Sequence, residues 1–95
     1  MPMQDKMEVR TPWVTCSVTP GMLTKEWAVE MKTADGKQIS LFASSTHVDE
    51  KNGLIQVNVL EKADDTYLVY LPADPFEVSS RFINVSGKDV KWVSD

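Results

Sequence analysis

The chain has 95 residues, of which 42% are hydrophobic and 25% charged, and its formal net charge is −4. This composition is that of one globular domain, since domains run from about 50 to 250 residues. Lys and Arg are scattered through the sequence rather than clustered. Binding to nucleic acid or to an anionic membrane surface is therefore disfavoured, because phosphate neutralisation needs a basic stripe.

The single cysteine, Cys16, cannot form an intramolecular disulfide, and this favours a reducing compartment, the cytoplasm. The N-terminus, MPMQDKMEVR, lacks the apolar stretch of a secretory signal. No apolar run approaches the ~20 residues that a membrane-spanning helix needs. We expect a flexible N-terminal tail over residues 1–11 and a single β-barrel domain over residues 12–95.

The clearest structural signal is a β-hairpin over residues 26–42. Trp27, Val29 and Met31 alternate with polar or small residues, which is the period of two of a half-buried strand. A similar alternation follows from residue 38 onward. Between the two segments, Asp35-Gly36 predicts a turn with Gly36 at positive φ, a conformation that glycine adopts without steric cost.

Five further short strands are predicted, each bounded by turn residues. They cover residues 13–19, 54–61, 67–71, 81–85 and 90–93. The polar connection over residues 43–53 has room for one helical turn near residues 45–49. The loop that contains Phe76 and Val78 is expected to fold down onto the core.

The predicted fold class is all-β, a small antiparallel barrel of five to seven short strands. An SH3-like barrel is the first choice, with a small sandwich or an OB-like barrel as alternatives. Alternation on each strand predicts the core residues: Val14, Cys16, Val18, Trp27, Val29, Met31, Ile39, Leu41, Ile55, Val57, Val59 and Val69.

Catalytic chemistry has little support in the sequence. His47, the only histidine, lies near Asp49 and Glu50 in a polar connection, where such residues are usually just solvated. Cys16 alternates with Val14 and behaves as a small hydrophobe would. One His and one Cys do not make a metal site. We therefore predict no enzyme, no catalytic residue, no metal and no cofactor.

The aromatic residues are more informative, because a core of this size cannot hold all of them. Trp13 is out of phase with the apolar face of its strand, and Trp92 lies between charged neighbours. First and last strands of a barrel pair to close it, so these two indoles could flank one groove, with Tyr70 as a third member. The alternative is that both indoles only pack against one end of the core.

These observations predict a non-catalytic module that binds a protein or a peptide at Trp13, Trp92 and Tyr70. The alternative is a structural or accessory subunit that self-associates through a free strand edge, with the first strand as the expected edge. A small enzyme is a distant third. We expect a protein or peptide partner and no binding to nucleic acid or membrane. The chain is expected to be a monomer or a weak homodimer.

Overall fold

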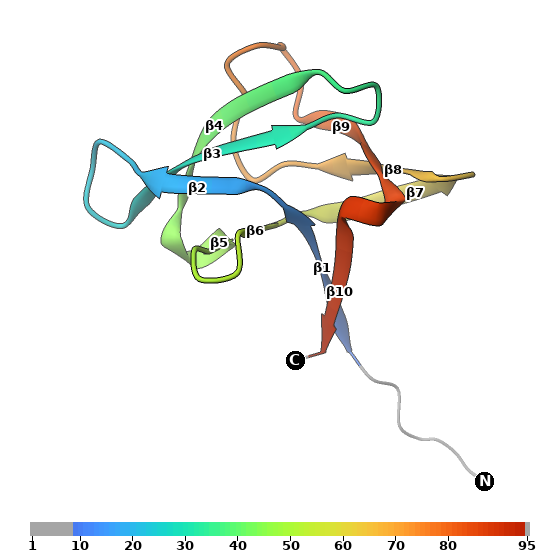
Figure 1. The fold of residues 1–95 in the computed structure, drawn as a ribbon, viewed down its shortest axis with the longest axis horizontal. Helices are drawn as coiled ribbons and strands as arrows, with labels where there is room; N and C mark the ends of the chain where they lie inside the picture. Colours follow the sequence, from blue (N-terminus) through green and yellow to red (C-terminus); the bar gives the residue numbers. More distant parts are fainter. Residues whose placement is uncertain (1–8, 95) are drawn as a thin grey trace, which may run out of the picture.

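The computed structural model describes residues 9–94, which form ten short strands and two 3₁₀ turns (Figure 1). The strands are β1 (Arg10–Thr15), β2 (Ser17–Pro20), β3 (Glu26–Lys32), β4 (Gln38–Ser44), β5 (Val48–Asp49), β6 (Leu54–Gln56), β7 (Asn58–Ala63), β8 (Thr66–Tyr70), β9 (Phe82–Ser86) and β10 (Val90–Ser94). The 3₁₀ turns are η1 (Ser45–His47) and η2 (Gly87–Asp89).

The strands form three small antiparallel sheets. Their strand orders are β10-β1-β6-β5, β2-β3-β4 and β7-β8-β9. The predicted all-β class is confirmed. The finer prediction of a barrel is not shown, because none of the three sheets closes on itself.

Two predicted strands each divide at one residue, and these breaks explain why three sheets form. The strand expected over residues 13–19 breaks at Cys16, whose N–H donates to the Gly53 carbonyl at 2.9 Å. The strand expected over residues 54–61 breaks at Val57, whose N–H donates to the Pro12 carbonyl at 3.2 Å. After each break the chain pairs with a new neighbour, so β1 and β2 belong to different sheets, as do β6 and β7.

The hairpin predicted over residues 26–42 is confirmed as β3 and β4. Its register places Val29 opposite Leu41 and Met31 opposite Ile39, with all four side chains buried. In the turn, the Gly36 N–H donates to the Thr33 carbonyl at 3.0 Å, and Gly36 has φ of 88°, as predicted. This φ lies in the region that favours glycine.

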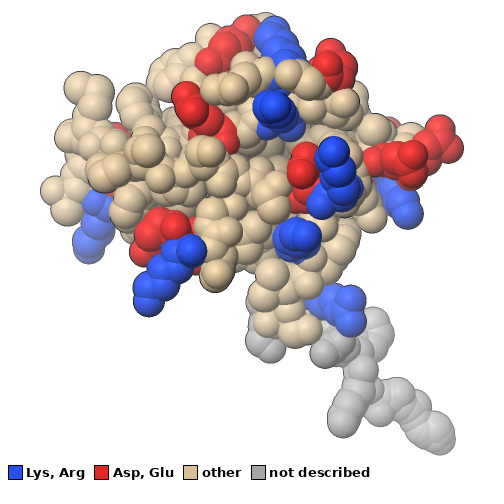
Figure 2. All heavy atoms as spheres, in the orientation of Figure 1, with Lys and Arg blue, Asp and Glu red and all other residues tan. Residues whose placement is uncertain are grey.

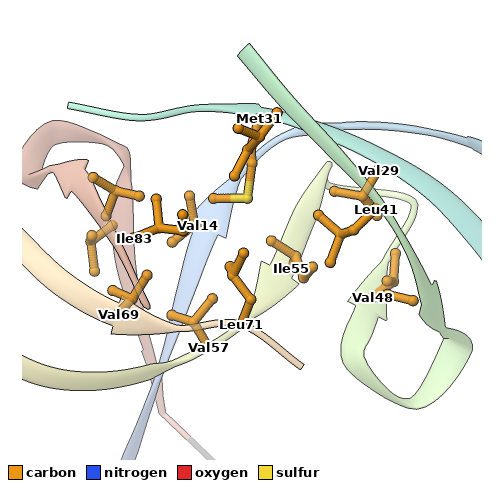
Figure 3. Packing of buried hydrophobic residues seen from close by; sticks show 14 residues of the cluster. Val14, Val29, Met31, Leu41, Val48, Ile55, Val57, Val69, Leu71 and Ile83 are labelled. Carbon is orange, nitrogen blue, oxygen red and sulfur yellow. The ribbon is translucent and has the colours of Figure 1, made fainter. Parts of the chain in front are cut away.

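One hydrophobic core lies between the three sheets (Figure 3). Most predicted core residues are buried, but Cys16, Val18, Trp27 and Val59 are only partly buried and pack against its margin. The core also contains residues that the alternation argument did not assign. These are Ala43, Val48, Leu71, Ile83, Val85 and Val90.

The first strand begins at Arg10, three residues before the predicted start at Trp13. Arg10 and Thr11 already belong to β1, and they pair with the end of β10. The remainder of the expected flexible tail, residues 1–8, lies outside the described residues. β1 and β10 leave the body of the protein together as a two-stranded ribbon (Figure 1).

Charged side chains of both signs are dispersed over the face of the protein seen in Figure 2. Among the described residues, no helix has the length and apolar character needed to cross a membrane.

Candidate functional site

Five side chains form a continuous row on the outside of the sheets, here called the outer row. Cross-strand pairing places Trp13 opposite Gln56, Asn58 opposite Tyr70, and Tyr70 opposite Phe82. Directly paired residues have Cβ atoms about 4.5–5.5 Å apart and share one face of the sheet. The outer row therefore runs across five strands, from Trp13 on β1 to Phe82 on β9.

The core fixes which way the middle of the outer row faces. Ile55 and Val57 are buried, at 0% and 3% exposure. Successive side chains of a strand point to opposite faces, so Gln56 and Asn58 point outward. The two amide side chains thus lie between the aromatic ends of the outer row.

A groove of about 310 Å³ follows the middle of the outer row, and we call it the outer groove. It is lined by His47, Gln56, Val57, Asn58, Tyr70, Leu71, Pro72 and Arg81. These residues come from η1, the β6–β7 segment, β8 and the segment that follows it. Trp13 is not one of the lining residues, but it lies directly opposite Gln56, which is.

Tyr70 is held at the groove by two neighbours. Its ring centroid lies 4.9 Å from that of Phe82, with the two ring planes tilted by 57°. The guanidinium carbon of Arg81 lies 5.9 Å from the Tyr70 centroid, within the range of a cation–π interaction. Tyr70 is half-buried, so one part of it packs while the rest faces solvent.

Arg81 is oriented by an ion pair with Asp74. The Arg81 Nε donates to Asp74 Oδ1 at 2.7 Å. This hydrogen bond raises the pKa of Arg81 above its already high ordinary value. Asp74 is 81% exposed and Arg81 37%, so the pair lies at the surface and adds little stability. A guanidinium carries five N–H donors, and the bond to Asp74 uses only the one on Nε.

The structure brings Trp13 and Tyr70 to the same outer row but separates Trp92 from them. β1 and β10 pair, as expected of the first and last strands, with Trp13 opposite Lys91 and Trp92 opposite Pro12. Adjacent pairs in a ladder point to opposite faces, so the two indoles lie on opposite sides of the ribbon. Trp92 packs edge-on against Tyr67 at 6.3 Å and is 43% exposed.

Two of the residues considered for catalysis, Asp49 and Cys16, have environments that shift their pKa values. Asp49 accepts hydrogen bonds from the Asn52 side chain at 2.8 Å and from the Asn52 N–H at 3.2 Å, and these bonds lower its pKa. Burial raises the pKa of the Cys16 thiol to about 11. Within residues 9–94, no group of three or more His, Cys, Asp or Glu side chains could hold a metal ion.

The sequence did not single out Gln56, Asn58, Pro72 and Arg81 as site residues. A signal for the two amides was present, because both alternate with buried apolar residues. No pattern in the sequence specifies that β6 pairs with β1 and that β7 pairs with β8. These pairings place the two amides between Trp13 and Tyr70.

No protein-family model matches the chain, and no curated protein and no solved structure matches it.

Proposed function

We propose that this protein is a non-catalytic module that binds an extended peptide segment of a partner protein in the outer groove. The observation that carries the proposal is the outer row, in which Gln56 and Asn58 lie between the aromatic residues Trp13 and Tyr70. An amide side chain both donates and accepts, as a peptide backbone requires. Aromatic faces pack well against proline and apolar side chains, which is the usual basis of peptide recognition by small β domains.

The hydrogen-bond donors of the outer groove favour a peptide that carries a carboxylate. Arg81 is among its lining residues, and none of the lining residues is acidic. The Arg81 Nε is already bonded to Asp74 at 2.7 Å, which leaves the other guanidinium N–H donors for a ligand. A carboxylate of the peptide can accept from these donors, and this bond would fix the orientation of the peptide in the groove.

The proposal includes an SH3-like arrangement of the three open sheets and a cytoplasmic location. The SH3-like arrangement is supported by the two breaks at Cys16 and Val57, which let two segments pass from one sheet to the next around a single core. The location is supported by the single unpaired cysteine. The non-catalytic assignment is supported by the two hydrogen bonds that Asn52 donates to Asp49. Asp49 is the carboxylate nearest to His47 in the sequence, and these bonds engage both of its oxygens.

Peptide selection followed by NMR tests this function. Displayed random peptides are selected on the full chain, and the strongest binders are titrated into ¹⁵N-labelled protein. We expect the selected peptides to contain proline or an apolar residue together with Asp or Glu. The largest amide shifts should fall on residues that line the outer groove.

Matched variants decide whether the outer groove is the site. Tyr70→Ala and Gln56→Ala should each weaken binding of the selected peptide at least tenfold. Phe76→Ala is the control, because Phe76 is also an exposed aromatic but packs against Phe42 outside the groove. Equal loss of binding in Phe76→Ala, or full binding in Tyr70→Ala and Gln56→Ala, would contradict the proposal.

A further inference from the structure

Free sheet edges are templates for pairing with another chain, and natural proteins protect them. In this chain two of the longer edges are covered by loops. At the β4 edge, Ser40 bonds to the backbone of Phe76 and to the carboxylate of Glu77. At the β9 edge, the Asn84 carbonyl accepts from the Ala34 N–H at 2.7 Å. Neither edge is open along its middle.

Three other edges are protected in different ways. β5 has only two residues, and the four-residue β2 ends at Pro20, which has no N–H to donate. β7 carries a register shift between Val59 and Glu61, and it exposes the charged Glu61 and Lys62. Short length, proline, irregular register and charge all discourage pairing.

β10 has only one of these protections, the charged side chain of Lys91. It spans five residues, pairs with β1 in unbroken register and contains no proline. Trp92 and Val93 are 43% and 41% exposed. Among the described residues, no hydrogen bond from outside the ladder reaches Lys91, Trp92 or Val93. The first strand, by contrast, is not the free edge that the sequence suggested, because it pairs with β10 on one side and β6 on the other.

Pro12 shows which backbone groups of β10 face outward. The Pro12 carbonyl accepts a hydrogen bond from the Val57 N–H, on the β6 side of β1. This carbonyl therefore points away from β10. Alternate residues of a strand bond to opposite neighbours. Lys91 and Val93 therefore bond to β1, while the N–H and C=O of Trp92, the residue opposite Pro12, point to the free flank.

We propose that two copies of this chain pair antiparallel through β10, about a two-fold axis at Trp92. Each Trp92 N–H donates to the C=O of Trp92 in the second copy, giving a reciprocal pair of hydrogen bonds. On the opposite face, each Lys91 lies opposite Val93 of the second copy, so no two lysines oppose each other directly. Like charges directly opposite would destabilise the pair.

The occupant is a second copy because this strand is complementary to itself. A two-fold pairing uses the same flank of both chains and closes at two copies. The other sheet edges are covered or protected, so no second open flank would extend the pair into a filament. Five residues a side make a small interface, in the weak class that buries less than about 1,200 Å². The dimer is therefore concentration-dependent.

The pairing is independent of peptide binding. Trp92 and Trp13 lie on opposite faces of the ribbon, and the outer groove is lined by none of the residues of β10. A dimer would carry two outer grooves, which increases the apparent affinity for a partner with two target segments.

Sedimentation velocity on the full chain, from micromolar concentrations up to about 1 mM, tests the proposal. We expect a reversible shift from monomer to dimer. Val93→Glu places a carboxylate opposite Lys91 of the second copy and should lower the dissociation constant a few-fold. Val93→Lys opposes like charges and should raise it by a similar factor or more.

These two variants share one exposed position, so effects on folding are matched, and circular dichroism checks that both remain folded. Phe82→Ala, which removes an exposed aromatic from β9, is the control and should leave the dissociation constant unchanged. A chain that stays monomeric up to about 1 mM overturns the proposal and leaves the edge to a different partner. A dimer that responds equally to Glu and Lys at position 93 also overturns it.

Discussion

Glu77 binds Ser40 through both oxygens of its carboxylate. Its Oε1 accepts from the Ser40 N–H at 2.7 Å, and its Oε2 accepts from the Ser40 hydroxyl at 2.5 Å. The neighbouring Phe76 N–H donates to the Ser40 carbonyl at 2.9 Å. The loop therefore occupies the backbone groups of β4 that another strand would otherwise use.

We expect Glu77→Ala to release this loop from β4. The hydrogen bonds from Ser40, the one from its hydroxyl above all, lower the pKa of Glu77. A carboxyl with a lowered pKa stabilises the folded state above its ordinary pKa, and this contribution is lost as the pH falls through the folded value. The protection of the Ser40 amide against hydrogen exchange should therefore fall in Glu77→Ala at neutral pH, and in the unmodified protein below about pH 4.5.

Glu30→Ala is the matched control, because Glu30 is an exposed glutamate on the neighbouring strand, directly opposite Ser40. Its removal should leave the protection of the Ser40 amide intact. Unchanged protection in Glu77→Ala would mean that the loop is held by Phe76 alone.

Alternation in the sequence predicts the faces of the strands well but not their partners. Val14 and Cys16 both face the core side, although the strand breaks at Cys16. Ile55 and Val57 also both face the core, although the strand breaks at Val57. A bend changes the neighbouring strand without changing which side chains point inward. For that reason the inward faces could be predicted from the sequence, whereas the division into three sheets could not.

Where a strand is apolar on both faces, alternation cannot assign the inside. In the segment Tyr67-Leu68-Val69-Tyr70-Leu71 every residue is apolar or aromatic, and Leu71 was missed although it is fully buried. The candidate site shows the same limit. Trp13 and Tyr70 face outward, but the separation of Trp92 from them depends on its register against Pro12, which no pattern in the sequence specifies.

The two leucines at positions 71 and 60 give a direct test of the core. Leu71 is 0% exposed and Leu60 is 50% exposed. Leu71→Ala should lower the free energy of unfolding by about 2–5 kcal/mol, through lost transfer energy and a residual cavity. Leu60→Ala should change it by less than about 0.5 kcal/mol, as surface substitutions usually do. Urea titrations of both variants measure the difference, and similar losses would show that the core is placed wrongly.

Two glycines at positive φ separate backbone strain from steric overlap. Gly36 has φ of 88°, and a Cβ there would meet nothing within 4 Å. Gly53 has φ of 66°, and a Cβ there would lie 2.9 Å from the Cys16 carbonyl oxygen. That oxygen belongs to the segment that bonds to Gly53 at the break between β1 and β2. Substitution at Gly53 therefore adds an overlap to the strain that both positions share.

We expect Gly36→Ala to cost about 1 kcal/mol of unfolding free energy, the usual penalty for a side chain in the left-handed region. Gly53→Ala should cost clearly more, because the backbone around Cys16 must also shift. Thermal or urea unfolding of the two variants ranks them. An equal cost at both positions would argue against the close approach of Gly53 to Cys16.

The thiol of Cys16 should react slowly in the folded protein. Burial raises its pKa from 9.0 to about 11, so at pH 8 roughly 0.1% is thiolate, against about a tenth for an exposed thiol. Because the thiolate is the reactive form, an aromatic disulfide reagent should modify the native protein about a hundredfold more slowly than the urea-unfolded chain. The native rate should rise about tenfold per pH unit up to pH 10.

The same pKa shift links Cys16 to alkaline stability. Its thiol stays protonated in the folded state at pH values where the unfolded chain ionises, so it destabilises the fold progressively as the pH rises from about 9 to about 11. Cys16→Ala removes this contribution, and its unfolding free energy should fall less steeply over that range than that of the unmodified protein. Equal slopes, together with equally fast modification of the native and unfolded chains at pH 8, would mean that the thiol is solvated rather than packed against the core. Slow modification and a reduced slope would instead support burial as the origin of the raised pKa, since both measurements depend on the same desolvated sulfur atom.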